Sequence, residues 1–143
     1  MIAGSYHRIL GVDTEASDYM ARLTKGYPFA YQVLGFLYWK QYNENGTTGD
    51  VDALLPSFDY YLENYVYEKI WSELSPREKK IIAVLDDESP MKVADIRNSL
   101  ALSSGEFSVY RDRLNKKGLL DISNYGYVSL KLPRFKSVIR LWI

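Results

Sequence analysis

The most apolar stretch of the chain runs from Leu23 to Trp39, and its pattern predicts how the first half is organised. A Gly-Tyr-Pro break at Gly26–Pro28 is followed by a run in which only Gln32 is polar. Proline is favoured at the first position of a helix, and a glycine just upstream ends a preceding helix in the left-handed conformation. We therefore predict a helix over about 28–42 that is apolar nearly all round, which indicates a central helix surrounded by others. Its apolar run of about 12 residues is well short of the roughly 20 that span a membrane.

Two further helices are predicted on either side of this central one. Thr14 is a suitable N-cap, and the apolar positions that follow it share one face, which predicts a helix over about 14–25. Asp50 can cap a later helix over 51–73 that is broken or kinked near Pro56. Three helices in the first half predict a small all-helical bundle.

The helix predicted over 51–73 is rich in tyrosine and is preceded by a polar connection. Its apolar face at helical spacing comprises Val51, Leu54, Leu55, Phe58, Leu62, Tyr65, Val66 and Ile70. An aromatic stripe at this spacing is more often core or partner surface than a platform for stacking bases. The connection before it, residues 43–49, contains glycine and asparagine and is expected to be an exposed, mobile turn.

The second half opens with a capping box, Ser75-Pro76-Arg77-Glu78, which is a strong helix-start signal. The pattern then predicts helices over 76–86, 92–101 and 104–117, strands over 119–123 and 127–132 joined by a tight turn at 124–126, and a last helix over 134–142. Three helices followed by a β-hairpin is the order of a winged helix-turn-helix. The fold class is therefore mainly α: a helical bundle over 1–74, followed over 75–143 by a winged helix-turn-helix with a β-hairpin wing.

Composition narrows the possible chemistry. The chain of 143 residues has no cysteine and a single histidine, His7, which excludes zinc sites and Cys-His or Ser-His nucleophile pairs. The adjacent carboxylates at 86–88 are expected to form a solvated turn rather than a cation site. No signal peptide or membrane span is apparent, so we expect a cytoplasmic protein without membrane contact.

The net charge of zero conceals an asymmetry between the two halves. Residues 1–74 contain 5 Lys and Arg against 10 Asp and Glu, whereas residues 75–143 contain 13 against 8. Such asymmetry indicates two units with different partners. The basic half is compatible with binding to nucleic acid but does not establish it.

The motif GYPFAYQVLG, a downstream W-x-x-L-S-P and the winged-helix order together resemble the C-terminal part of AAA+/STAND-type ATPases. More narrowly, this arrangement is similar to bacterial and archaeal ATP-binding proteins in which a helical lid and a winged helix follow the ATPase core. The resemblance covers roughly residues 9–140. It implies that Gly26, Tyr27 and Pro28 face the nucleotide in the parent protein. No arginine lies on the predicted central helix, so this helix is not expected to sense the γ-phosphate through an arginine.

The machinery that would bind phosphate is missing from the chain. There is no G-x-x-x-x-G-K-[ST] loop to hold the β- and γ-phosphates, and no strand ends in paired carboxylates for Mg²⁺. We therefore expect a C-terminal fragment that is not itself an enzyme and has no cofactor of its own. Its expected partner is its own N-terminal ATPase core, with ATP or ADP and magnesium bound in the full-length parent.

The predicted winged helix is where DNA contact would occur. Helix 104–117 would enter a major groove, with basic side chains around it on the phosphates. The expected DNA-binding residues are Ser104, Ser108, Arg111, Arg113, Lys116, Lys117, Tyr125 and Lys131, with Arg134 and Lys136 as further basic residues after the wing. Few of these side chains are suited to reading base edges, so any DNA contact is expected to be weakly sequence-specific and strongly salt-dependent.

Three functional hypotheses follow. The leading one is a regulatory fragment of an ATP-dependent switch protein, whose lid closes over nucleotide and whose winged helix reports that closure to DNA or to a protein partner. The alternative is a self-contained winged-helix transcription regulator that dimerises through its tyrosine-rich helix 51–73. The third is a module that only binds other proteins.

Overall fold

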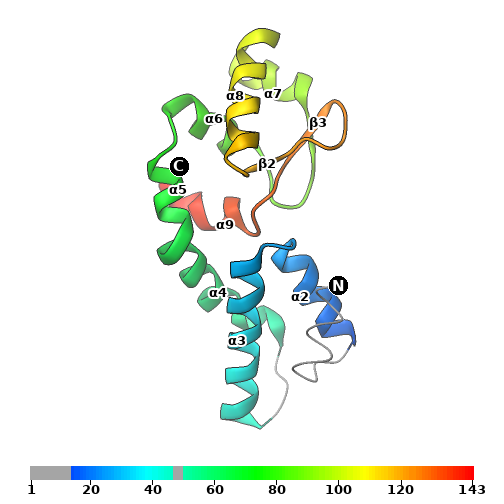
Figure 1. The fold of residues 1–143 in the computed structure, drawn as a ribbon, viewed down its shortest axis with the longest axis vertical. Helices are drawn as coiled ribbons and strands as arrows, with labels where there is room; N and C mark the ends of the chain where they lie inside the picture. Colours follow the sequence, from blue (N-terminus) through cyan, green and yellow to red (C-terminus); the bar gives the residue numbers. More distant parts are fainter. Residues whose placement is uncertain (1–13, 47–49) are drawn as a thin grey trace. The chain divides into compact units, whose positions relative to one another are not determined.

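The computed structural model describes residues 14–46 and 50–143, and His7 lies outside these residues. The described residues 14–46 and 50–66 belong to one compact unit, and residues 67–143 form a second (Figure 1). Helices dominate both units, and a small three-stranded antiparallel sheet lies in the second. The predicted fold class, a mainly α chain with a helical bundle and a wing, is confirmed. The compact units divide between Val66 and Tyr67, upstream of the junction expected at Ser75.

The first unit begins with α2 (Thr14–Thr24) and α3 (Pro28–Asn45). Helix α3 ends at Gly46, which has a φ of 69° and donates its N–H to the Tyr42 carbonyl oxygen at 2.7 Å. The turn expected from residue 43 is therefore wrong for residues 43–45, because the helix continues until Gly46 ends it in the left-handed conformation. The rest of that turn, residues 47–49, lies outside the described residues.

Helix α3 is the central helix of the first unit, but it is not enclosed on all sides. It contacts α2, α4 and the short helix before α4, and its buried residues are Ala30, Leu34, Gly35, Leu37 and Tyr38. About half of the side chain of Phe36, Trp39 and Tyr42 is exposed. The prediction that other helices surround this apolar helix is thus wrong for the face that carries Phe36, Trp39 and Tyr42. The contacting helices cover only the other side of α3.

The chain continues through a 3₁₀-helix η1 (Val51–Leu54), α4 (Leu55–Leu62), a π-helix η2 (Glu63–Tyr67) and α5 (Glu68–Ser72). The predicted cap is confirmed, because the Asp50 carboxylate accepts from the Asp52 N–H at 3.0 Å. The predicted break near Pro56 is also confirmed, since this proline lies in the first turn of α4 and the 3₁₀-helix ends just before it.

The π-helix changes which tyrosine is buried. Phe58 and Leu62 are fully buried, as expected from helical spacing, but Tyr65 is 67% exposed and Tyr67 is fully buried. A π-turn contains one extra residue, which rotates the following side chains relative to a continuous α-helix. The prediction that Tyr65 is a core position is therefore wrong, and Tyr67 is the buried tyrosine instead.

The second unit is built on three helices, α6 (Pro76–Val84), α7 (Val93–Leu100) and α8 (Ser104–Lys116). The predicted capping box at Ser75 is confirmed, and a second one at Ser103 begins α8. In each, the serine oxygen accepts the N–H of a glutamate three residues on, and the glutamate accepts the serine N–H.

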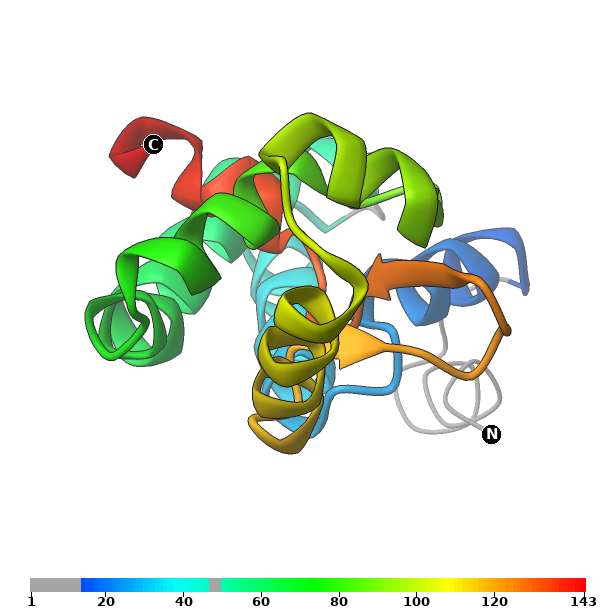
Figure 2. The ribbon, with the colours of Figure 1, turned by 90° about the horizontal axis from the view of Figure 1, so that it is seen from above.

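The wing is an antiparallel sheet in the order β1-β3-β2, formed by β1 (Met91–Lys92), β2 (Leu120–Asp121) and β3 (Tyr127–Leu130). Met91 pairs with Val128, and Leu120 pairs with Leu130. Strand β2 follows α8 and lies beside it, with β3 next to β2 (Figure 2). The sequence did not predict β1, which is only two residues long and forms through its pairing with β3.

The last helix, predicted over 134–142, is α9 (Phe135–Ile139) followed by a 3₁₀-helix η3 (Arg140–Trp142). The Tyr67 ring meets the Phe135 ring edge-on at 5.0 Å, and its hydroxyl donates to the Pro133 carbonyl at 2.6 Å. The core of the helices and wing comprises Ile81, Ile82, Leu85, Ile96, Phe107, Leu114, Leu119, Leu120, Val128 and Leu130. No helix among the described residues is long and apolar enough to cross a bilayer.

Candidate functional site

The corner between α2 and α3 has the geometry that the sequence predicts. Lys25 and Gly26 both adopt positive φ, 48° and 72°, and this ends α2. The Tyr27 N–H donates to the Thr24 carbonyl at 2.8 Å, and Pro28 then begins α3. The left-handed stop at Gly26 and the proline restart are therefore confirmed.

The surface of this corner is accessible to another group. Gly26 and Pro28 are exposed, whereas Tyr27 is half-buried, and burial raises the pKa of its phenol. A tyrosine phenol is protonated near neutral pH in any case, so Tyr27 can donate a hydrogen bond. Lys25, directly before Gly26, is exposed and adds a positive charge beside the corner, which the sequence analysis did not include among the site residues. Contact of the corner with a nucleotide stays a prediction.

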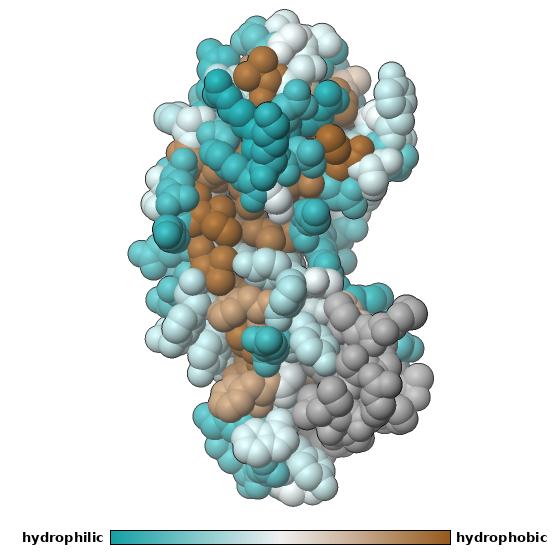
Figure 3. Space-filling view, viewed as in Figure 1, coloured by the Kyte–Doolittle hydropathy of each residue, from teal (hydrophilic) through white to brown (hydrophobic). Residues whose placement is uncertain are grey.

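Helix α8, the predicted recognition helix, packs through Phe107 and Leu114 and exposes the opposite side. Its exposed residues at helical spacing are Gly105, Val109, Asp112 and Lys116. Figure 3 shows mostly hydrophilic residues over this helix, with an apolar patch among them. An exposed valine and a carboxylate at the centre of this face do not suit a phosphate backbone or base edges.

Lys117 takes part in a contact between helices. Its Nζ donates to the Glu78 Oε2 at 2.9 Å, and Glu78 is only 3% exposed. Burial alone would raise the pKa of Glu78, but hydrogen bonds from Lys117 and Ser75 lower it overall. The ammonium of Lys117 therefore holds the C-terminal end of α8 against α6, an arrangement that reduces its availability to a phosphate.

The two predicted arginines lie on different flanks of α8. The Arg113 guanidinium carbon is 5.5 Å from the centre of the Tyr110 ring. Arg111 is half-buried, with its Nε 3.8 Å from the Asp112 Oδ1. At 100° per residue, Ser104, Ser108 and Arg111 fall on one side of the exposed face, and Arg113 and Lys117 on the other.

The wing presents one highly exposed aromatic side chain. Tyr125 is 98% exposed in the turn before β3, where Gly126 has a φ of 81°. Hydrogen bonds from Ser123, with a smaller contribution from the charge of the exposed Lys131, lower the pKa of Asp121. The described residues therefore do not bring the eight predicted DNA-binding side chains onto one continuous basic surface. Whether they contact DNA stays a prediction.

A small cavity that sequence reasoning missed lies between α6, α7 and α8. Its volume is about 180 Å³, and it is lined by Arg77, Lys80, Leu100, Ala101, Leu102 and Glu106. The two capping boxes signalled where α6 and α8 begin, but not that Arg77 and Glu106 meet. Among residues 14–46 and 50–143, no group of three His, Cys, Asp or Glu residues is placed to hold a metal ion.

Comparison with known proteins adds two findings. The model of a protein family described as a domain of unknown function, DUF8462, matches residues 64–139, more than half of the chain. A solved structure of a Walker-type ATPase of Pyrococcus abyssi aligns with a TM-score of 0.68 at 16% sequence identity. The alignment covers 96% of this chain and 39% of that ATPase, so this chain spans well under half of its length. No curated protein matches the sequence.

Proposed function

The chain belongs to the family described as a domain of unknown function, DUF8462, and we propose that it is the lid and winged-helix region of an ATP-binding switch protein of the AAA+/STAND type. The observation that carries this proposal is the fold shared with part of a Walker-type ATPase over 96% of the chain. The shared part includes both compact units, so the likeness extends beyond a common helix-turn-helix.

In this proposal the first unit closes over a nucleotide through the corner Gly26–Pro28. The corner supports the assignment because Gly26 and Pro28 are exposed and the backbone is fixed by the Tyr27–Thr24 hydrogen bond. A rigid, exposed loop before a helix positions groups against a ligand with little loss of entropy on binding. The chain has no phosphate-binding loop, so this contact adds to a site whose phosphate-binding groups lie elsewhere in the parent protein.

The test is to measure Mg·ATP binding by this chain alone and by the product of its complete open reading frame. The proposal predicts that the complete product contains a phosphate-binding loop and binds Mg·ATP, whereas these 143 residues alone do not. A complete product that has no such loop and does not bind Mg·ATP would contradict the proposal.

For the second unit we propose a protein partner. The exposed face of α8, with Val109 and Asp112 between Gly105 and Lys116, supports a protein surface better than a phosphate backbone. Fluorescence anisotropy with a 20-bp duplex at low and high salt tests this choice. We expect only weak, sequence-independent binding, with a Kd of about 10 μM or above. Tight binding that is lost in a Lys116→Gln variant would contradict the proposal and favour DNA.

A specific observation also favours the alternative, a regulator that dimerises through its helical unit. Tyr60 and Tyr65 are exposed on α4 and η2, and Phe36 and Trp39 are exposed on α3. Exposed aromatic side chains are enriched at protein interfaces. Sedimentation equilibrium of the chain decides between the two. A dimer that a Tyr65→Ser variant converts to monomer supports the regulator, whereas a monomer at high concentration opposes it.

A further inference from the structure

The cavity between α6, α7 and α8 has the size of a side chain rather than of a nucleotide. Its volume is about 180 Å³, against roughly 300–1,000 Å³ for sites that bury small-molecule ligands. A single amino-acid side chain is a group of about this size.

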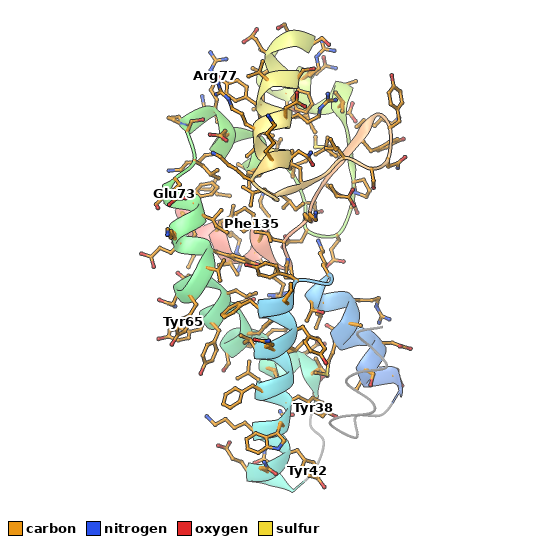
Figure 4. The ribbon with its side chains drawn as sticks, in the orientation of Figure 1. Tyr38, Tyr42, Tyr65, Glu73, Arg77 and Phe135 are labelled. Atoms are coloured by element: carbon orange, nitrogen blue, oxygen red, sulfur yellow. The ribbon has the colours of Figure 1, made fainter. Side chains whose placement is uncertain are left out.

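The rim of the cavity is positively charged, and the carboxylate in its lining, Glu106, already forms an ion pair. Arg77 reaches from α6 toward α8, where its Nη1 is 3.1 Å from the Glu106 Oε2 (Figure 4). Glu106 also accepts the Ser103 N–H as part of the capping box, and hydrogen bonds from Ser103 and Arg77 lower its pKa. This carboxylate therefore remains charged and committed to the protein's own groups.

Two cations remain available at the rim. A guanidinium has five N–H donors, and the bond to Glu106 leaves further donors of Arg77 for another carboxylate. Lys80 is exposed and forms no ion pair within the described part of the chain. Arg77 and Lys80 against Glu106 leave one net positive charge to attract an anion.

The rest of the lining is apolar and held in place. Leu100 and Leu102 are half-buried on either side of Ala101, which has a φ of 53°. The Leu102 N–H donates to the Arg97 carbonyl at 3.1 Å, and the Arg97 Nε donates back to the Leu102 carbonyl at 3.3 Å. These two bonds fix the turn between α7 and α8, so the lining is formed before a ligand arrives.

We propose that this cavity binds the carboxylate side chain of an acidic, apolar-flanked segment of a partner protein. A glutamate in such a segment has an aliphatic stem for Leu100 and Leu102 and a charged end for Arg77 and Lys80. A phosphate is polar on all sides and would leave the two leucines without a contact. The cavity belongs to the second unit alone, and the proposed binding needs no nucleotide. If the cavity does not bind a carboxylate, the proposed ATP-binding role is therefore unaffected.

The test is an NMR titration of the ¹⁵N-labelled chain with the peptide acetyl-Leu-Glu-Leu-amide. We expect the amide signals of Lys80, Ala101 and Leu102 to shift, with a millimolar Kd. The neutral peptide acetyl-Leu-Gln-Leu-amide is expected to bind about tenfold more weakly, a difference of about 1.4 kcal/mol. A Lys80→Gln variant, which breaks no ion pair of the described chain, is expected to lose most of the affinity.

The matched control is Lys92→Gln, which removes an exposed charge from the same unit outside the cavity and should leave the affinity unchanged. Equal binding of the glutamine peptide, shifts away from the cavity, or an equal loss in the control would overturn the proposal. Stronger binding of inorganic phosphate or of a DNA duplex at the same residues would also overturn it, in favour of a phosphate site.

Discussion

Glu78 connects two helices of the second unit, α6 and α8. Its carboxylate accepts the Ser75 N–H at 3.0 Å and the Lys117 ammonium at 2.9 Å, so it caps α6 and binds the end of α8. The side chain is 3% exposed, while that of Lys117 is 42% exposed. Glu78 is therefore buried while Lys117 is hydrated. The contribution of the pair to stability is expected to lie between that of an exposed ion pair and that of a fully buried one.

We predict that Glu78→Gln lowers the free energy of unfolding of the second unit by about 1–2 kcal/mol. The loss is smaller than the roughly 3–5 kcal/mol for breaking a fully buried pair, because water reaches Lys117. Urea denaturation followed by circular dichroism measures it. Glu88→Gln, at an exposed position in the next turn, is the control and should change stability by less than about 0.5 kcal/mol.

Because Glu78 is titratable, the stability of the second unit should depend on pH. Because the pKa of Glu78 in the folded chain is lowered from 4.5, the unfolded chain binds more protons near that pH. The stabilisation is fully present above the unfolded pKa and is lost as the pH falls through the lowered folded value. The stability difference between the wild-type chain and Glu78→Gln should thus shrink between pH 6 and pH 3. A difference that stays constant over this range would rule out the ionised pair as its source.

At the scale of elements, α9 is held by a carboxylate distant in sequence. Asp87 accepts the N–H groups of Lys136 and Ser137 at 2.8 and 2.9 Å and the Ser137 hydroxyl at 2.7 Å. The Lys136 ammonium donates back to the carbonyls of Ala83 and Leu85 near the end of α6. The expectation of a solvated turn at 86–88 is therefore wrong for Asp87, which caps a helix of only five residues.

We predict that Asp87→Ala lowers stability by about 1–3 kcal/mol, because it leaves two N–H groups and a hydroxyl without an acceptor. Hydrogen exchange of the α9 amides should accelerate more than exchange in α8. Asp86→Ala, one residue earlier and exposed, is the matched control. Equal effects of the two substitutions would show that the cap contributes nothing.

The π-helix η2 gives a second prediction at this scale. Removing one residue from a π-turn restores a continuous α-helix, so deletion of the exposed Asn64 should leave Tyr67 in register with Leu62. Deletion of the exposed Lys69 in α5 should instead displace Tyr67 from its contact with Phe135. Thermal unfolding should therefore show a much larger loss of stability for the second deletion. The reverse order would contradict this account of η2.

The parts of the fold that the sequence predicted are those determined by neighbouring residues. The capping box at Ser75, the left-handed stop at Gly26 and the restart at Pro28 each depend on contacts within a few positions. Strand β1, the Asp87 cap and the Lys117–Glu78 pair join residues 35 or more positions apart. Local periodicity contains no signal for such pairings. The cavity at Arg77 was missed for the same reason.

At the scale of the whole molecule, the two halves of the sequence carry opposite net charge, and the fold is similar to part of a Walker-type ATPase. Residues 1–74 contain an excess of acidic side chains and residues 75–143 an excess of basic ones. The corner at Gly26–Pro28 was predicted from sequence and has the expected backbone, whereas the expected DNA-binding residues are divided between two flanks of α8 and the wing. The central claim is therefore the proposed contact between this corner and a nucleotide.

The most direct test of that claim is the affinity for Mg·ATP of the complete open reading frame product with Pro28→Ala. Pro56→Ala is the matched control, because Pro56 is also an exposed proline in the first turn of a helix. We predict that Pro28→Ala weakens Mg·ATP binding about tenfold, or about 1.4 kcal/mol, while Pro56→Ala leaves it unchanged. Equal affinities of the two variants and the wild-type protein would contradict a nucleotide-facing lid.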